Sequence, residues 1–106
     1  MRTLVDSVYD WARFGSLPRG YAWITRELAE RRVTAAALVA ATHRYGDLGT
    51  IRRMGALLEG KGANARVLRK LEGALSDSTG TIPWIPTKPK RGTLNRRWGV
   101  IMNGEI

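Results

Sequence analysis

Few side chains in this sequence have the type and spacing that catalysis needs. Asp6 and Asp10 stand four positions apart, so one helical face would carry both carboxylates, and such a pair can bind a cation or transfer a proton. Arg2 and Arg13 lie three or four residues from these carboxylates, which favours simple ion pairing. His43 is the single histidine, and no phosphate-binding glycine loop or metal-ligand spacing occurs. The sequence therefore predicts a protein that is not an enzyme and that uses no metal and no cofactor.

The basic side chains form a more unusual pattern. A short segment near the C-terminus combines five cations with one indole: Lys88, Lys90, Arg91, Arg96, Arg97 and Trp98. Such a segment can straddle phosphates while the indole stacks on a base. The alternative is a basic turn with Trp98 buried as a core anchor, because strand alternation turns Trp98 away from Arg97.

Further cations on predicted helices are candidate contacts to a partner or a nucleic acid. They are Arg52, Arg53, Arg66, Arg69 and Lys70. The competing interpretation is that these stripes are solvated helix faces, which is the usual role of a charged stripe. The sequence alone leaves both interpretations open.

The net charge favours a polyanionic or acidic partner. The 106 residues include 18 Lys and Arg against 9 Asp and Glu, which gives +9 at neutral pH. Residues 80–106 carry five basic and one acidic side chain, a net of +4. A balance of this kind bears on association with anions and says nothing about the fold.

Composition also excludes several classes of protein. The chain has no cysteine, so disulfide frameworks, thiolate metal sites and thiol catalysis are excluded, and a reducing cytosol is the expected compartment. The longest apolar run, residues 35–41, is far shorter than the roughly 20 residues of a membrane span. We therefore expect a cytoplasmic protein with no membrane partner.

The expected fold is α+β and mostly α, as a single domain over residues 1–106. Glycine punctuation and apolar spacing predict about five short helices within residues 1–76, with Thr34, Thr50 and Asn64 as caps of the last three. The helical periodicity of the sequence ends at residues 76–80 (SDSTG). Beyond them, residues 81–85 and 96–103 predict a two-stranded β-ribbon over 80–103, anchored on the helices by Trp84 and Trp98.

One glycine indicates how the ribbon meets the helices. Gly55 stands in the middle of the fourth predicted helix, where glycine costs about 1 kcal/mol relative to alanine. The cost is understandable if a bulky ring approaches there, and Trp98 is the candidate. Arg53 and Glu59 would then lie beside a buried seam, with Arg53 donating to the backbone of the ribbon.

Three stretches in order resemble a known family. They are residues 2–6 (RTLVD), residues 50–59 (TIRRMGALLE), and a closing proline, glycine, tryptophan and asparagine pattern over residues 82–103. Together they resemble the C-terminal domain of the abortive-infection type of antitoxin from bacterial type IV toxin–antitoxin systems. The residues that carry the motif, to which we assign a structural role, are Gly55, Leu58, Glu59, Gly92, Trp98 and Asn103.

The resemblance implies an antitoxin-type regulator, which counters a nucleotidyltransferase-type toxin, serves as the partner domain of a transcriptional regulator, or does both. In that family an N-terminal winged-helix domain binds the operon's own DNA, and the C-terminal domain counters a nucleotidyltransferase-like toxin without forming a stable complex. The similarity begins at Arg2, so no winged helix is expected in this chain and specific promoter binding is not expected either. The residues at Pro83, Trp84 and Ile85 also depart from the family's simpler leucine–proline run.

Two other functions stay open at this stage. The chain could be a small basic nucleic-acid-binding protein that uses residues 88–97 as an arm, or a structural, dimerising part of a larger regulator. The first of these predicts binding that weakens steeply with salt.

Overall fold

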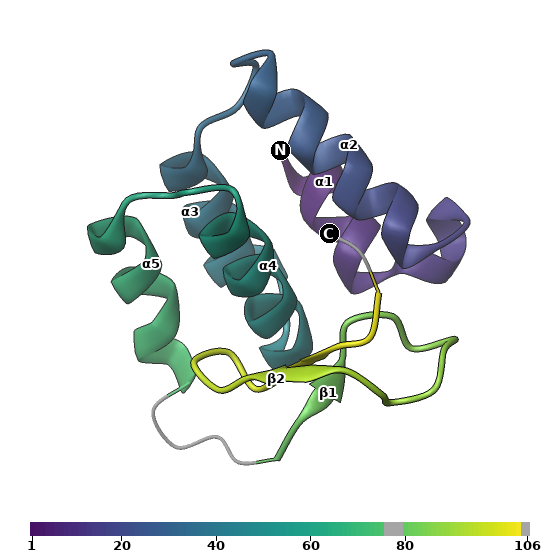
Figure 1. Cartoon of the computed structure of the whole chain (residues 1–106). Coiled ribbons are helices and arrows are strands. Elements are labelled where there is room, and N and C mark those ends of the chain that lie inside the picture. The colour runs from purple at the N-terminus through teal and green to yellow at the C-terminus, as the bar shows by residue number, and fades with distance from the viewer. Residues whose placement is uncertain (76–79, 105–106) are drawn as a thin grey trace.

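A computed structural model describes residues 1–75 and 80–104 and is mostly helical, as predicted (Figure 1). The helices are α1 (Arg2–Tyr9), α2 (Leu17–Ala29), α3 (Ala35–Tyr45), α4 (Leu48–Gly60) and α5 (Ala65–Glu72), with 3-10 turns η1 (Trp11–Phe14) and η2 (Gly73–Leu75). The strands are β1 (Ile82–Pro83), β2 (Thr93–Asn95) and β3 (Val100–Met102). Residues 76–79, where the sequence predicts that the helical part ends, lie outside the described residues.

Side-chain caps explain where several helices begin. Thr34 accepts a hydrogen bond from the amide of Ala37, and Asn64 accepts one from the amide of Arg66, as the sequence predicts. The prediction that Thr50 caps α4 is wrong. Asp47 is the cap, and its carboxylate accepts from both the amide and the hydroxyl of Thr50, at 2.8 and 2.7 Å. A charged carboxylate also interacts more favourably with the helix dipole than a hydroxyl does.

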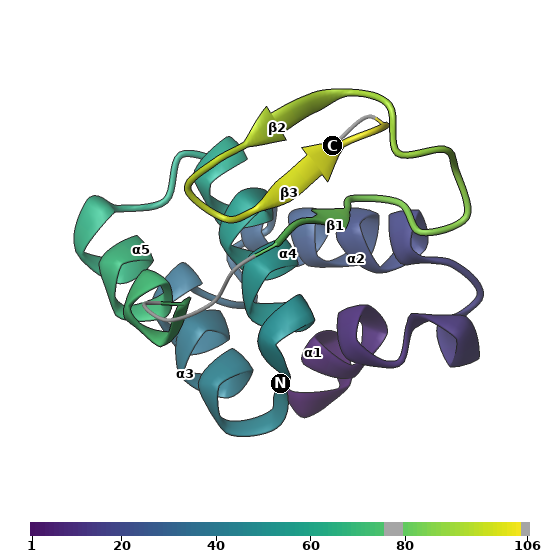
Figure 2. The same cartoon turned by 90° about the horizontal axis from the view of Figure 1, so that it is seen from below.

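Helix α4 is the centre of the core. It contacts α1, α3 and α5 as well as β3, and it is seen beneath the sheet in Figure 2. Met54, Leu57 and Leu58 are fully buried along it. Because none of these short helices is stable alone, their mutual packing around α4 is what stabilises the fold.

The β part is a three-stranded sheet, so the prediction of a two-stranded ribbon is wrong in its strand count. The strand order is β1-β3-β2, with β1 parallel and β2 antiparallel to β3. Residues 96–99, predicted as strand, form the turn between β2 and β3. Gly99 at φ +68° permits this turn, and Gly92 permits β2 to begin close to β3, since a Cβ there would lie 2.1 Å from the carbonyl oxygen of Met102.

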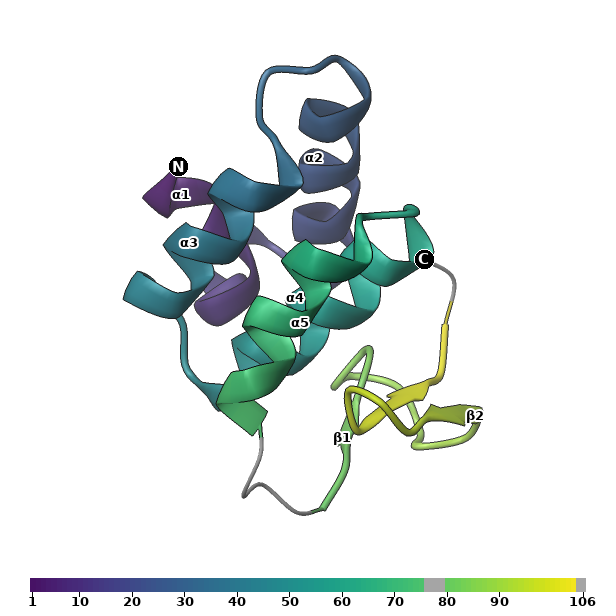
Figure 3. The ribbon, with the colours of Figure 1, turned by 90° about the vertical axis from the view of Figure 1, so that its left-hand side faces the viewer.

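The sheet lies to one side of the helices (Figure 3) and is attached by its two tryptophans. Both Trp84 and Trp98 are almost completely buried, which confirms their predicted role as anchors. The ring of Trp84 stacks on that of Tyr21 in α2 with centroids 3.7 Å apart, and the Tyr21 hydroxyl donates to the Trp84 carbonyl at 2.8 Å. This contact connects the sheet to α2 as well as to α4.

Candidate binding surface on the sheet and α5

The notch at Gly55 receives Trp98, as the sequence predicts. A Cβ on Gly55 would lie 2.2–2.4 Å from three carbons of the indole, so only glycine leaves room for the ring. Trp98 is 1% exposed, which removes it as a stacking platform for a base and confirms the alternative interpretation of this residue. Its indole N–H finds no acceptor within the described residues.

Two arginines of α4 bind the backbone of the sheet. Arg53 donates from Nε and Nη2 to the Pro83 carbonyl at 3.1 and 2.9 Å, which confirms the predicted contact to the ribbon backbone. Arg52 is 5% exposed and donates from Nη1 to the carbonyls of Gly80 and Gly99. Burial lowers the pKa of Arg53, the expected effect of removing a charge from water. Arg52 and Arg53 therefore serve the fold, because they bind the sheet to α4.

Arg97 holds the turn between β2 and β3 against the helices. Its guanidinium pairs with Glu59 of α4 at 2.8 Å and with Glu72 of α5 at 3.1 Å. Hydrogen bonds to these two carboxylates raise the pKa of Arg97. Asn95 donates to Glu59 as well, so Glu59 contacts both the last residue of β2 and the second residue of the turn.

Asn103 fixes the loop that carries Lys88 and Lys90. Its side-chain oxygen accepts from the Ile85 amide at 2.8 Å, and its amide nitrogen donates to the carbonyls of Ile85 and Pro89 at 2.9 and 3.0 Å. Asn103 thus positions a basic loop through hydrogen bonds to its backbone.

The remaining predicted contact residues lie on the surface. These seven side chains, called here the outer cations, are Arg66, Arg69 and Lys70 on α5, Lys88, Lys90 and Arg91 in the loop before β2, and Arg96 in the turn. All seven are exposed, and none forms an ion pair with any residue in 1–75 or 80–104. Arg96 follows β2 directly, and its neighbour Arg97 pairs with Glu72 of α5.

The candidate acid–base side chains form ion pairs or hydrogen bonds within the fold. Asp6 lies 3.8 Å from the guanidinium groups of both Arg2 and Arg13, and Asp10 lies 3.2 Å from Arg13, which confirms the predicted ion pairing. His43 hydrogen-bonds the Lys70 carbonyl at 2.8 Å. Among the described residues no group of acidic, histidine or cysteine side chains could hold a metal ion, and no helix is long and apolar enough to cross a membrane.

Comparison with known proteins identifies no relative. No family model matches the chain, and neither a curated protein nor a solved structure matches it. The antitoxin resemblance therefore stays a prediction from the sequence motifs.

Proposed function

We propose that this chain is a cytosolic, non-catalytic binding module of the antitoxin type, which counters a nucleotidyltransferase-like toxin through its outer cations. One observation supports the proposal most directly. The ten predicted contact residues divide into three that hold the sheet on the helices and seven that lie exposed without a described ion-pair partner. Unpaired cations on a rigid support are suited to an acidic partner surface.

Hydrogen bonds and ion pairs fix the backbone that carries the cations of the loop and the turn. Asn103 ties the loop of Lys88 and Lys90 to the sheet, and Arg97 ties the turn of Arg96 to α4 and α5. A partner therefore meets cations whose backbone positions are already fixed, which lowers the entropy lost on association. Such contacts contribute mainly to the rate and specificity of association, in agreement with an antitoxin that forms no stable complex.

The test is a growth assay in cells that express this chain together with a nucleotidyltransferase-like toxin of the kind that the antitoxin resemblance implies. Cells that express the toxin together with the wild-type chain should grow, and the K88S/K90S/R91S variant should fail to rescue them. The matched control is R31S/R44S/K61S, which removes three exposed cations outside the outer cations. We expect the control to rescue growth as well as the wild type does.

Two results would contradict the proposal. The first is a wild-type chain that gives no protection against that toxin. The second is a loop variant that folds with an unchanged thermal midpoint and still protects as well as the control does.

Nucleic-acid binding is the second candidate function, favoured by the exposed loop of Lys88, Lys90 and Arg91. Since Trp98 is buried, phosphate contacts would have to supply the affinity. Binding to duplex DNA should then weaken by about 0.9 log units per log unit of salt for each phosphate contacted, and the triple loop variant should lower that slope by up to about 2.7. Binding that does not change with salt would exclude this candidate.

A further inference from the structure

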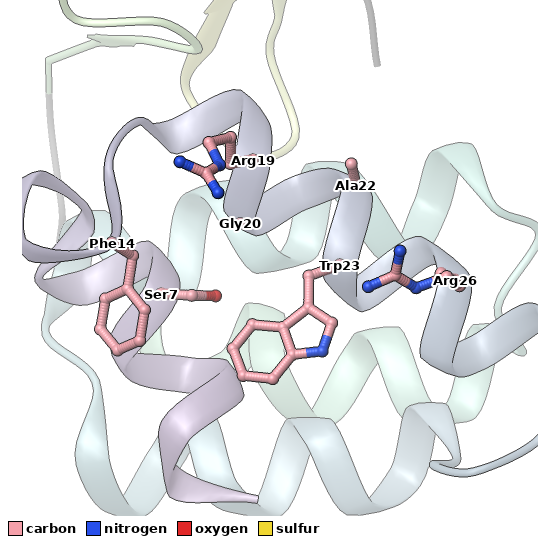
Figure 4. Close-up of a pocket in the computed structure, with 7 residues that line it drawn as sticks. All are labelled: Ser7, Phe14, Arg19, Gly20, Ala22, Trp23 and Arg26. Carbon is pink, nitrogen blue, oxygen red and sulfur yellow. The ribbon is translucent and has the colours of Figure 1, made fainter.

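A pocket separate from the outer cations opens between α1, η1 and the first turns of α2 (Figure 4). Its volume is about 400 Å³, within the range of small-molecule sites, roughly 300–1,000 Å³. The residues that line it are Ser7, Phe14, Arg19, Gly20, Ala22, Trp23 and Arg26. We call it the α2 pocket.

Helix α2 places two cations on either side of an aromatic ring in this pocket. Arg19, Trp23 and Arg26 follow one another at spacings of four and three, so they share one face of the helix. Both arginines are exposed, and neither forms an ion pair within the part of the chain that the structure describes.

The acidic side chains near the pocket pair with other arginines and not with Arg19 or Arg26. Asp6 and Asp10 lie near Arg13, and Glu27 is paired with Arg32. The α2 pocket is therefore positively charged, with the compensating carboxylates committed elsewhere.

Aromatic rings and a hydroxyl complete the pocket. The rings of Phe14 and Trp23 have centroids 6.4 Å apart and planes tilted by 35°, and both residues are half-buried, so part of each ring remains accessible. In Figure 4 the Ser7 hydroxyl points into the space between these two rings. Ser7 is 0% exposed and its hydroxyl donates to the Leu4 carbonyl at 2.6 Å, so this side chain lines the pocket and is already hydrogen-bonded within α1.

Gly20 brings this hydroxyl close to the rings. A Cβ on Gly20 would lie 2.5 Å from the Ser7 carbonyl oxygen, so α1 and α2 approach closely only because this residue is glycine.

We infer that the α2 pocket binds a nucleoside phosphate. The base stacks on the indole of Trp23, and the phosphate accepts hydrogen bonds from the guanidinium groups of Arg19 and Arg26. Guanidinium forks match the oxygens of a phosphate, and a planar base stacks on an aromatic face such as that of an indole. A simple anion would use only the cations, and a neutral apolar ligand would use only the rings, so the combination favours a ligand with both parts.

The experiment is calorimetric titration of the full chain with adenosine monophosphate. We expect saturable binding, a loss of at least about tenfold in affinity for R19S/R26S, and a similar loss for W23L. The matched control R31S/R44S, which removes two exposed arginines elsewhere, should bind like the wild type. Adenosine alone and inorganic phosphate alone should each bind at least about tenfold more weakly than the nucleotide.

Several outcomes would overturn the inference. They are no saturable binding at millimolar nucleotide, undiminished binding by R19S/R26S, or inorganic phosphate that binds as tightly as the nucleotide. Arg19 and Arg26 are exposed, so their variant decides the matter even if W23L fails to fold. The K88S/K90S/R91S variant should bind the nucleotide normally, which keeps this result independent of toxin neutralisation.

Discussion

Replacing Gly55 with alanine tests the packing on which the sheet depends. In an ordinary helix interior this change stabilises by about 1 kcal/mol, because alanine has the higher helix propensity. Here the new Cβ would lie 2.2, 2.3 and 2.4 Å from three carbons of the Trp98 indole. Carbon atoms prefer separations of about 3.5–4.0 Å, so the ring must retreat by at least about 1 Å.

The ring has little freedom to retreat. Trp98 is 1% exposed, and the sheet that carries it is bound to α4 through Arg53 and Pro83. Overpacking a well-filled core costs about 1–3 kcal/mol and sometimes more. After the propensity gain is subtracted from the upper part of that range, we expect Gly55→Ala to lower the free energy of unfolding by about 1–2 kcal/mol, and the thermal midpoint by about 5 °C or more.

Urea unfolding followed by circular dichroism measures this change, with Gly49→Ala as the matched control. Gly49 lies on the same helix, and its nearest neighbour beyond the helix backbone is 3.7 Å from the ideal Cβ position, an ordinary contact. The control should therefore be neutral or stabilising by up to about 1 kcal/mol. In a Trp98→Leu background, Gly55→Ala should lose its destabilising effect, because the clashing ring is absent.

The reasoning is refuted if Gly55→Ala stabilises the protein as Gly49→Ala does. It is also refuted if Gly55→Ala has the same effect with Trp98 and with Leu at position 98, since the two changes would then be uncoupled.

Three further predictions concern the bonds that hold the sheet. Arg53→Met removes both donors to the Pro83 carbonyl and should lower the free energy of unfolding by about 1–3 kcal/mol in urea titration, whereas Arg69→Met on the surface should be neutral. Burial raises the pKa of Tyr21 above its ordinary 10.0, so above pH about 10 the unfolded chain loses this proton first and stability falls as pH rises. Tyr21→Phe should cost about 0.5–1.5 kcal/mol at pH 7 and make that alkaline fall shallower than in the wild type; equal slopes would contradict the assignment. Asn103→Ala should speed hydrogen exchange at the Ile85 amide, its bonded partner, and unchanged protection there would show that Asn103 does not fix the loop.

The sequence predicted local features well because local residues determine them. Apolar spacing predicted five helices, and Thr34 and Asn64 were identified as caps from residue type and position alone. The Thr50 cap was wrong because the helix begins earlier: Asp47 accepts from the Thr50 amide, so Thr50 lies inside the first turn of α4. Two neighbouring cap candidates cannot be ranked without the backbone path that precedes the helix.

The α2 pocket was missed at the sequence level, although one signal was present. Arg19, Trp23 and Arg26 repeat at helical spacing, which places two arginines and an indole on one face of the helix. The contribution of Phe14 from η1 and of Ser7 from α1 arises only when Gly20 brings the helices together.

The sequence by itself determined the positive charge, the helical segments and the pairing of a mid-helix glycine with a tryptophan, because these follow from composition, periodicity and side-chain size. Only the tertiary structure decided which cations serve the fold. Arg52, Arg53 and Arg97 looked the same as Arg91 and Arg96 along the chain, but packing set the first three against carbonyls and carboxylates and left the others in water. The third strand also depends on the tertiary structure, because β2 forms only where the turn at Gly99 brings β3 back beside it. Hydrogen bonds between distant residues depend on their positions in space, and the chain reveals those positions only when it is folded.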